Sequence, residues 1–323
     1  MDMIIILYVD DLLLLGEDLS KIEDIQCQLG KLYQMKDLQP TSSNLGIQIT
    51  RNWNGQTIWI NQQAYIENTL KRFELQDANS TKTLLPAGIH LEKSEEPVAL
   101  NTKTYYQQII RTLIYTALGT RPDIAFAAMR LSWFNNNPTQ EHIKYAKYVL
   151  QYLKGTKELK IKYNGDSDAG LIGYSDSDWG ENRDDWHSTS GHVFLMANGA
   201  ISWASQWQKI VTLSVGEVEY IQLASTGWQA AWLKYFSGEI GFPIEGPIPL
   251  CSDNQGVIFL TINPAVEHWT KHIDIWHHYI WEQYEDKVIE PFHIAGEENP
   301  ADLFTKSLPV IKVERFRAKI GLS

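Results

Sequence analysis

The stretches LIGYSDSD (residues 171–178) and GHVFLMANGAISWASQ (residues 191–206) decide which fold the second half of this chain can adopt. The first stretch predicts a strand, with side chains alternating between its two faces. The second predicts two further strands on either side of Asn198-Gly199, a dipeptide that favours a tight hairpin turn. The unit therefore begins with three consecutive antiparallel strands.

The sequence beyond this hairpin alternates between helical and strand patterns. The predicted elements are a long helix at 215–236, a strand at 248–252, a short helix at 254–260, a helix around 274–285, a strand at 288–294 and a helix from residue 300. A hairpin sheet that leads into alternating helix and strand is typical of a mixed α/β sheet covered by helices. We expect a mixed five-stranded sheet with flanking helices.

The first half of the chain predicts strands at its start and helices towards its end. The predicted elements are strands at 4–9 and 12–15, a helix at 20–35, a hairpin of 45–51 with 56–60, a helix at 62–73, a linker at 83–103, and helices at 104–118, 122–134 and 139–153. A Gly- and Asp-rich break at 164–170 separates the halves. The whole chain is thus α/β (α+β) in class.

Composition excludes several classes of protein. The 323 residues carry a net charge of −11, 44% hydrophobic residues and two cysteines, which rules out a disordered chain and a disulfide framework and points to a reducing, intracellular compartment. The longest apolar run, residues 4–15, is too short to span a bilayer, and no signal peptide precedes it. Residues 1–165 hold 18 Lys+Arg and 17 Asp+Glu, whereas residues 166–323 hold 10 and 22. Taken alone, this acidity argues against tight binding to phosphate backbones.

Four acids of the second half stand where the predicted elements converge. They are Asp176 in the first strand, Glu219 early in the long helix, Asp253 where a strand meets a helix, and Asp302 in the first turn of the last helix. Clustered carboxylates can hold the two divalent ions that cleave phosphodiesters without a covalent nucleophile. Each acid also has a structural explanation, since Asp253 could cap a helix and Asp302 could complement a helix dipole.

Asp178 and Glu217 are alternatives to Asp176 and Glu219. The spacing of Ser214 and Glu217 fits a capping box, which gives Glu217 a structural role and leaves Glu219 free.

A further acidic pair, Asp10-Asp11, lies at a turn between two apolar strands of what reads as a buried hairpin. Hard cations prefer oxygen ligands, so this pair is a candidate metal site for handling a nucleoside triphosphate. The alternative is an ordinary acidic turn, because Asp is a common turn former.

Several segments, in the right order along nearly the whole chain, resemble the Pol polyprotein of copia-type LTR retrotransposons, in which a reverse transcriptase precedes a ribonuclease H (RNase H). The segments are Tyr8-Val9-Asp10-Asp11, Met35-Lys36-Asp37-Leu38, Leu45-Gly46-Ile47, residues 63–73 (QAYIENTLKRF), residues 120–125 (TRPDIA), residues 152–156 (YLKGT), Gly173-Tyr174-Ser175-Asp176, Ser188-Thr189-Ser190-Gly191, Glu219-Tyr220, Asp253-Asn254-Gln255, residues 271–275 (KHIDI) and residues 301–306 (ADLFTK).

The resemblance implies three parts: a reverse-transcriptase palm remnant at 1–95, a helical thumb or connection at 96–165, and an RNase H-like domain at 166–323. It implies that Asp176, Glu219, Asp253 and Asp302 bind Mg²⁺, or Mn²⁺, and hydrolyse the RNA strand of an RNA–DNA hybrid. Asp10 and Asp11 would be polymerase metal ligands. The implied partners are nucleic acid and the remaining reverse transcriptase or integrase of the same element, with no membrane.

Histidines near these motifs have weaker assignments. His272, Asp274, His277 and His278 could suggest a metal pair, but we interpret them as helix packing or surface residues. His293, upstream of Asp302, is a candidate for assisting product release.

Two departures from the family pattern affect the expected activity. The fingers, and the palm strand that supplies a third metal-binding acid, would lie upstream of Met1, so we expect no DNA polymerisation by this chain alone. Tryptophan also stands at five usually basic positions: Trp186, Trp207, Trp269, Trp276 and Trp281. We interpret each tryptophan as the replacement of a basic residue, which removes a phosphate contact and exposes an apolar ring. The alternative is that these rings stack on nucleic-acid bases. The competing hypothesis to an active RNase H is therefore a catalytically inactive relic that at most binds nucleic acid or acts as a scaffold.

Overall fold

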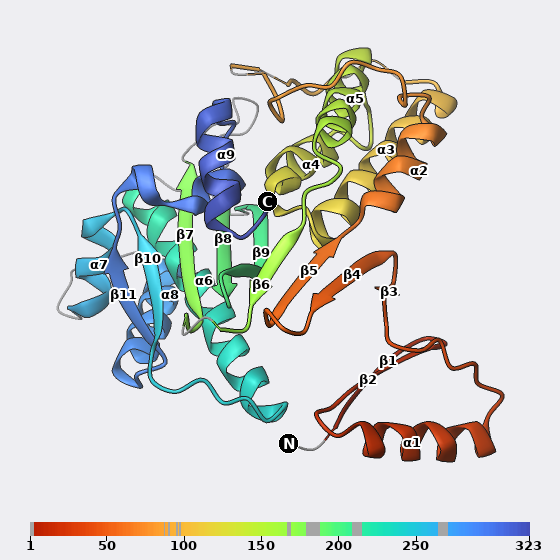
Figure 1. The fold of residues 1–323 in the computed structure, drawn as a ribbon. Helices are drawn as coiled ribbons and strands as arrows, with labels where there is room; N and C mark the ends of the chain where they lie inside the picture. The colour runs from red at the N-terminus through yellow and green to blue at the C-terminus, as the bar shows by residue number, and fades with distance from the viewer. Residues whose placement is uncertain are drawn as a thin grey trace.

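The computed structural model describes residues 3–323 except 87, 90, 95, 97, 167–168, 179–187, 209–214 and 264–270, and leaves out the side chains of 271–275 and 277. Its strands form sheets of two, four and five strands. Figure 1 shows helices α6 to α9 around the five-stranded sheet, helices α2 to α5 beside it, and β1, β2 and α1 at the N-terminal end. Within these residues, no helix has both the length and the hydropathy that a bilayer crossing requires.

The five-stranded sheet has the order β11-β10-β7-β8-β9. Its strands are β7 (Ile172–Asp178), β8 (Thr189–Met196), β9 (Gly199–Trp207), β10 (Ile248–Ser252) and β11 (Ile289–His293). The first three strands are antiparallel, whereas β10 runs parallel to both β7 and β11. The predicted mixed sheet is thereby confirmed, and its central strand, β7, carries Asp176.

The turn between β8 and β9 lies one residue earlier than expected. Ala197 and Asn198 have φ of 51° and 63°, so these two residues form the turn and Gly199 begins β9. Two positive φ angles match the twist that a two-residue hairpin requires.

Helices cover both faces of this sheet. They are α6 (Val215–Glu239), α7 (Gln255–Ile262), α8 (Lys271–Glu285), the short 3₁₀ segments η2 (Gly296–Glu298) and η3 (Pro300–Phe304), and α9 (Val310–Lys319). One core contains Phe194 with residues of α6, and the other contains Val193 with residues of η3 and α9, as alternation along β8 requires.

The prediction of one helix from residue 300 was wrong. Residues 300–304 form η3, and α9 begins only after Pro309. Proline lacks the N–H that a continuous helix would need and disfavours a helical backbone in the residue before it. Asp302 therefore lies in a 3₁₀ turn rather than in the last α-helix.

The first half supplies a helical layer and a second sheet. The helices are α2 (Gln63–Arg72), α3 (Leu100–Gly119), η1 (Pro122–Ile124), α4 (Ala125–Ser132) and α5 (Gln140–Gly155), and the four-stranded sheet is β3 (Ser43–Asn44), β4 (Ile47–Asn52), β5 (Thr57–Asn61) and β6 (Ile161–Asn164). Strands β3 and β6 were not predicted from the sequence. Strand β6 pairs with β5 across about a hundred intervening residues, so no local hairpin signal marks it. One core joins these helices to β8, η3 and α9. The part boundaries at 95 and 165 stay predictions.

Two of the recognised motifs meet in one buried network. The Arg121 guanidinium donates two hydrogen bonds to Asp123, at 2.9 and 2.8 Å, and two to Thr156. Tyr152 donates to Asp123 at 2.7 Å, and Arg317 of α9 donates to the Tyr152 hydroxyl at 3.0 Å. This network ties residues 120–125 and 152–156 to the C-terminal helix.

The N-terminal hairpin is exposed, contrary to the expectation of a buried one. Strand β1 (Ile4–Tyr8) pairs with β2 (Asp11–Leu15), and α1 (Leu19–Leu32) follows. No described residue before Thr57 is buried, because β1 and β2 pair only with each other and no buried cluster of the described chain includes them. Val9 and Asp10 form the turn, and Asp11 already belongs to β2.

Candidate metal centre

Asp176 sits in the central strand and is held by a segment far along the chain. Its side chain is buried, with 2% of the residue exposed. The hydroxyl of Thr305, just after η3, donates a hydrogen bond to Asp176 Oδ2. A buried carboxylate needs such donors to offset lost hydration.

A glycine on the neighbouring strand permits this approach. Gly191 of β8 lies opposite Asp176 in the ladder. A Cβ atom at Gly191 would lie 2.6 Å from Phe304 Cβ and 2.8 Å from Thr305 Cγ2. Only a residue without a side chain lets residues 304–305 pack this closely on β8.

Glu219 points into the same region from the first turns of α6. The residue is 7% exposed, and its Oε2 has no hydrogen-bond partner among the described residues. An orphaned buried carboxylate oxygen is costly unless a cation or a proton compensates for it.

Asp253 follows β10, where the sheet ends and α7 begins. The structure removes the capping explanation for this residue, because Asn254 caps α7 and its Oδ1 accepts from the backbone N–H groups of Gly256 and Val257. Gly296 lies close to Asp253: a Cβ there would lie 2.9 Å from Asp253 Oδ2. Asp253 therefore has no role in capping α7, and the missing side chain at Gly296 leaves room for its carboxylate.

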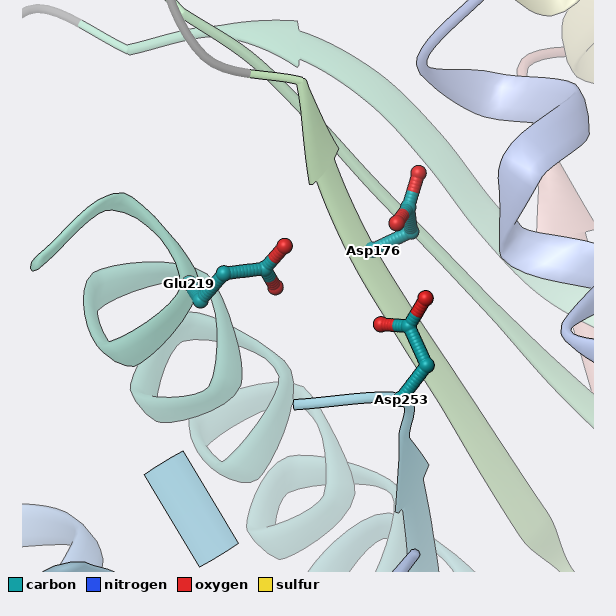
Figure 2. A group of neighbouring side chains, drawn as sticks. All are labelled: Asp176, Glu219 and Asp253. Carbon is teal, nitrogen blue, oxygen red and sulfur yellow. The ribbon is translucent and has the colours of Figure 1, made fainter. Parts of the chain in front are cut away.

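The side chains of Asp176, Glu219 and Asp253 converge, as Figure 2 shows. One carboxylate oxygen from each lies within 4.8 Å of the others. The three come from a strand, a helix and the end of a second strand, so only the packing of α6 on the sheet unites them. Clustered carboxylates with one orphaned oxygen suit a hard divalent cation, which takes oxygen ligands. The donor set therefore fits Mg²⁺ or Mn²⁺.

The electrostatics of the cluster are those of crowded, dehydrated acids. Burial raises the pKa of Glu219 to about 9, with Asp176 and Asp253 adding to the effect. Burial also raises the pKa of Asp176 to about 7, against the opposing influence of Lys306. Without a cation, both groups hold protons at pH values where an exposed carboxyl would be ionised.

Asp302 is buried beside this trio but belongs to a different set of contacts. Its Oδ1 lies 2.8 Å from the Nζ atom of Lys306, and its Oδ2 lies 3.9 Å from that of Lys312. Lys306 also reaches Asp176 Oδ2 at 3.4 Å. Burial lowers the pKa of Lys306, but Asp176 and Asp302 outweigh it, so the pKa is raised and the amine stays charged.

A pocket of about 500 Å³ opens beside the trio. It is lined by Glu219, Asp253, Asn254, Gln255, Gly256 and His293. His293, the last residue of β11, therefore faces the same space as two of the acids.

The structure does not bring the other candidates into this cluster. Asp10 and Asp11 are exposed at the N-terminal hairpin, and no further group of three clustered His, Cys, Asp or Glu side chains occurs in the part of the chain that the structure describes. Asp178 and Glu217 lie outside the trio, and Ser214 of the expected capping box lies outside the described residues. The side chains of His272, Asp274 and His277 also lie outside them, while His278 is exposed.

The expectation of exposed tryptophan rings was wrong at three of the five positions. Trp207, Trp276 and Trp281 are half-buried. The ring of Trp207 lies tilted against that of Trp133, with 5.3 Å between the centroids, and Trp276 packs against the core. Burying large apolar rings against a core stabilises the folded state. Trp186 and Trp269 lie outside the described residues.

Sequence reasoning missed three residues that shape the centre: Thr305, Lys306 and Gly296. The available signal was the segment 301–306, which places a lysine four residues after Asp302. No local pattern marks Gly296, because its role depends on contact with Asp253.

Comparison with known proteins finds relatives along nearly the whole chain. A family model described as reverse transcriptase (RNA-dependent DNA polymerase) matches residues 1–87. The retrovirus-related Pol polyprotein from transposon TNT 1-94 of Nicotiana tabacum is 37% identical over 99% of this chain, which spans 24% of that protein. The transposon Ty5-1 protein YCL074W of Saccharomyces cerevisiae is 34% identical over 69% of this chain and 72% of its own length.

Solved structures are similar to this chain at lower sequence identity. LC11-RNase H1 in complex with RNA/DNA hybrid aligns with a TM-score of 0.33 and 16% identity, over 42% of this chain and 93% of that one. The foamy viral protease-reverse transcriptase in complex with RNA/DNA hybrid aligns with a TM-score of 0.48 and 14% identity, over 90% of this chain and 36% of that one.

Proposed function

Because this chain belongs to the family of retrovirus-related Pol polyproteins of copia-type transposons, we propose that its acidic centre is a metal-dependent RNase H that hydrolyses the RNA strand of RNA–DNA hybrids. The observation that carries the proposal is the convergence of Asp176, Glu219 and Asp253, with carboxylate oxygens within 4.8 Å of one another. The match of residues 1–87 to reverse transcriptases supports a nucleic-acid-processing role for the rest of the chain.

Asp176, Glu219 and Asp253 would hold Mg²⁺ or Mn²⁺, with Asp302 as the fourth acid of the site. A bound divalent ion activates water and stabilises the charge that develops on a phosphodiester during hydrolysis. The chain shapes the ligand set: Thr305 donates a hydrogen bond to Asp176, and the absence of a side chain at Gly296 leaves room for Asp253. Glu219 brings a buried oxygen, Oε2, that has no hydrogen-bond partner among the described residues.

The pocket beside the trio would receive the scissile part of the RNA strand. The side-chain oxygen of Asn254 accepts hydrogen bonds from the N-terminus of α7. Gln255 is therefore the exposed amide side chain that lines this pocket. His293 lines the same pocket, and an imidazole there can pass protons to or from a departing product. We assign it this assisting role.

The cations of the acidic second half gather in one segment, two of whose lysines reach the centre. Of its ten Lys and Arg residues, five lie between positions 306 and 319: Lys306, Lys312, Arg315, Arg317 and Lys319. This segment includes α9 and adjoins the acids through Lys306 and Lys312. Clustered cations beside a metal centre are what a phosphate backbone requires.

The test is cleavage of an RNA–DNA hybrid, end-labelled on the RNA strand, by the full chain with Mg²⁺ or Mn²⁺. We expect RNA cleavage that Asp253→Asn abolishes, while the matched control Asp286→Asn, at an exposed position in the turn after α8, retains it. A DNA duplex of the same sequence should stay intact. Hybrid binding without cleavage at any ion concentration would reject the enzyme in favour of the inactive relic.

A further inference from the structure

The four acids of the centre are not equivalent, because a lysine already lies between two of them. The Nζ atom of Lys306 lies 2.8 Å from Asp302 Oδ1 and 3.4 Å from Asp176 Oδ2. Its side chain is 36% exposed, so the amine reaches inward from the rim of the centre. Asp176 is shared between this lysine-bridged pair and the acidic trio.

The trio has the opposite character. No ion pair joins Glu219 or Asp253 to a cation in the described chain, and Glu219 Oε2 has no hydrogen-bond partner there. The centre thus divides into an acidic position with no cation of the described chain paired to Glu219 or Asp253 and a position that already carries the amine of Lys306.

A divalent ion and the lysine amine cannot occupy the second position together. An ion bridging Asp176 and Asp302 would lie about 2.0–2.6 Å from their oxygens, in the space where the ammonium group lies. The two cations would also repel each other in a poorly hydrated site. Binding there requires Lys306 to swing out.

We propose that Lys306 is a positioning residue that holds the second cation position, so that the substrate-free centre binds one divalent ion at Asp176, Glu219 and Asp253. This inference rests on the metal centre proposed above and adds a mechanism that sets its ion stoichiometry. The Lys306 amine bridges Asp302 and Asp176 until a second ion replaces it.

The test counts Mn²⁺ ions bound per full chain, by calorimetric titration and by the electron paramagnetic resonance signal of free Mn²⁺, without substrate. For the wild type we expect one ion at the centre, removed by Asp253→Asn. Lys306→Met should bind a second ion at least about tenfold more tightly than the wild type does, a change equivalent to about 1.4 kcal/mol. Lys306→Arg, which keeps the charge, should restore the wild-type count.

Two further variants separate a specific role from a general loss of charge. Lys312→Met removes an amine 3.9 Å from Asp302 and not in contact with Asp176, so the second ion should tighten much less. Adding Asp302→Asn to Lys306→Met should abolish the second ion. If Lys306→Met fails to fold by circular dichroism, Lys306→Gln replaces it.

The outcomes are distinguishable from those of the hydrolysis test, because ion binding is measured without substrate. Two ions bound with similar affinity by the wild type, or a count that Lys306→Met leaves unchanged, would overturn the role of Lys306 while leaving the RNase H proposal intact. A wild type that binds no ion at the centre would overturn both.

Discussion

Replacing Glu219 by Gln is expected to stabilise the metal-free protein near neutral pH, although it removes a proposed metal ligand. Burial is the main cause that raises the pKa of Glu219 from 4.5 to about 9 in the folded chain. In the unfolded chain the carboxyl ionises near its ordinary value. Between about pH 4.5 and 9 the native state therefore holds a proton that the unfolded state has released.

The sign and the size of the effect follow from this difference. The free energy of unfolding falls as pH rises through the window, by about 1.4 kcal/mol per pH unit. From pH 4.5 to pH 7, Glu219 alone thus costs the metal-free protein about 3 kcal/mol. Gln has the shape of the protonated acid and no proton to lose, so Glu219→Gln should unfold at correspondingly higher urea concentration at pH 7.

The assay is urea unfolding at pH 5 and pH 7, in EDTA and in excess Mg²⁺. In EDTA the variant should lose most of the pH dependence, with a remainder from Asp176, whose pKa is raised to about 7. Mg²⁺ at 100 times its dissociation constant should stabilise the wild type by about 2.7 kcal/mol and the variant by much less. Glu217→Gln, two residues earlier on α6, is the matched control and should reproduce neither effect. A Glu219→Gln protein that is less stable than the wild type in EDTA at pH 7 would refute the assignment of Glu219 as a buried acid with a raised pKa.

Three further predictions concern other parts of the chain. Asp123→Asn leaves a buried guanidinium without its carboxylate and should lower the free energy of unfolding by about 3–5 kcal/mol in urea, whereas Lys157→Met, which removes a partly exposed ion pair, should change it far less, because solvent screens that pair; similar effects of the two would contradict the burial argument. Gly296→Ala places a methyl group 2.9 Å from Asp253 Oδ2 and should weaken Mn²⁺ binding about tenfold in a calorimetric titration, so an unchanged affinity would show that this glycine does not position the acid. The full chain should give no primer extension, because no third acid clusters with those at the β1–β2 hairpin within the described residues, and robust nucleotide incorporation would refute this.

Much of the fold could be read from local patterns. Strand β10 has the bounds that the sequence predicts, and Asn-Gly turns and helical spacing located most other elements to within a few residues. Two exceptions differ in their causes. Strand β6 was missed because its pairing with β5 is non-local. The final helix is interrupted before α9 for a local reason, Pro309, while the 3₁₀ turn at 300–304 packs against β7 and β8.

The sequence also predicted that four acids bind a metal, and nothing in it divided these acids into separate groups. Folding brought Asp176, Glu219 and Asp253 into a trio and paired Asp302 with a lysine. Only the Asp302–Lys306 contact has a local signal, the spacing of four residues. The contact of Lys306 with Asp176 and the convergence of the trio depend on how distant segments pack.

The sequence by itself determined the family, the class of fold and the acids that could bind a metal, since these depend on residue type and on spacing along the chain. Only the tertiary structure decided which acids can share a cation, which of them have a raised pKa, and that the amine of Lys306 lies between Asp176 and Asp302. The reason is physical: Thr305 holds Asp176 from 129 positions away, and both the electrostatic energy and the desolvation of a carboxyl depend on distances in space.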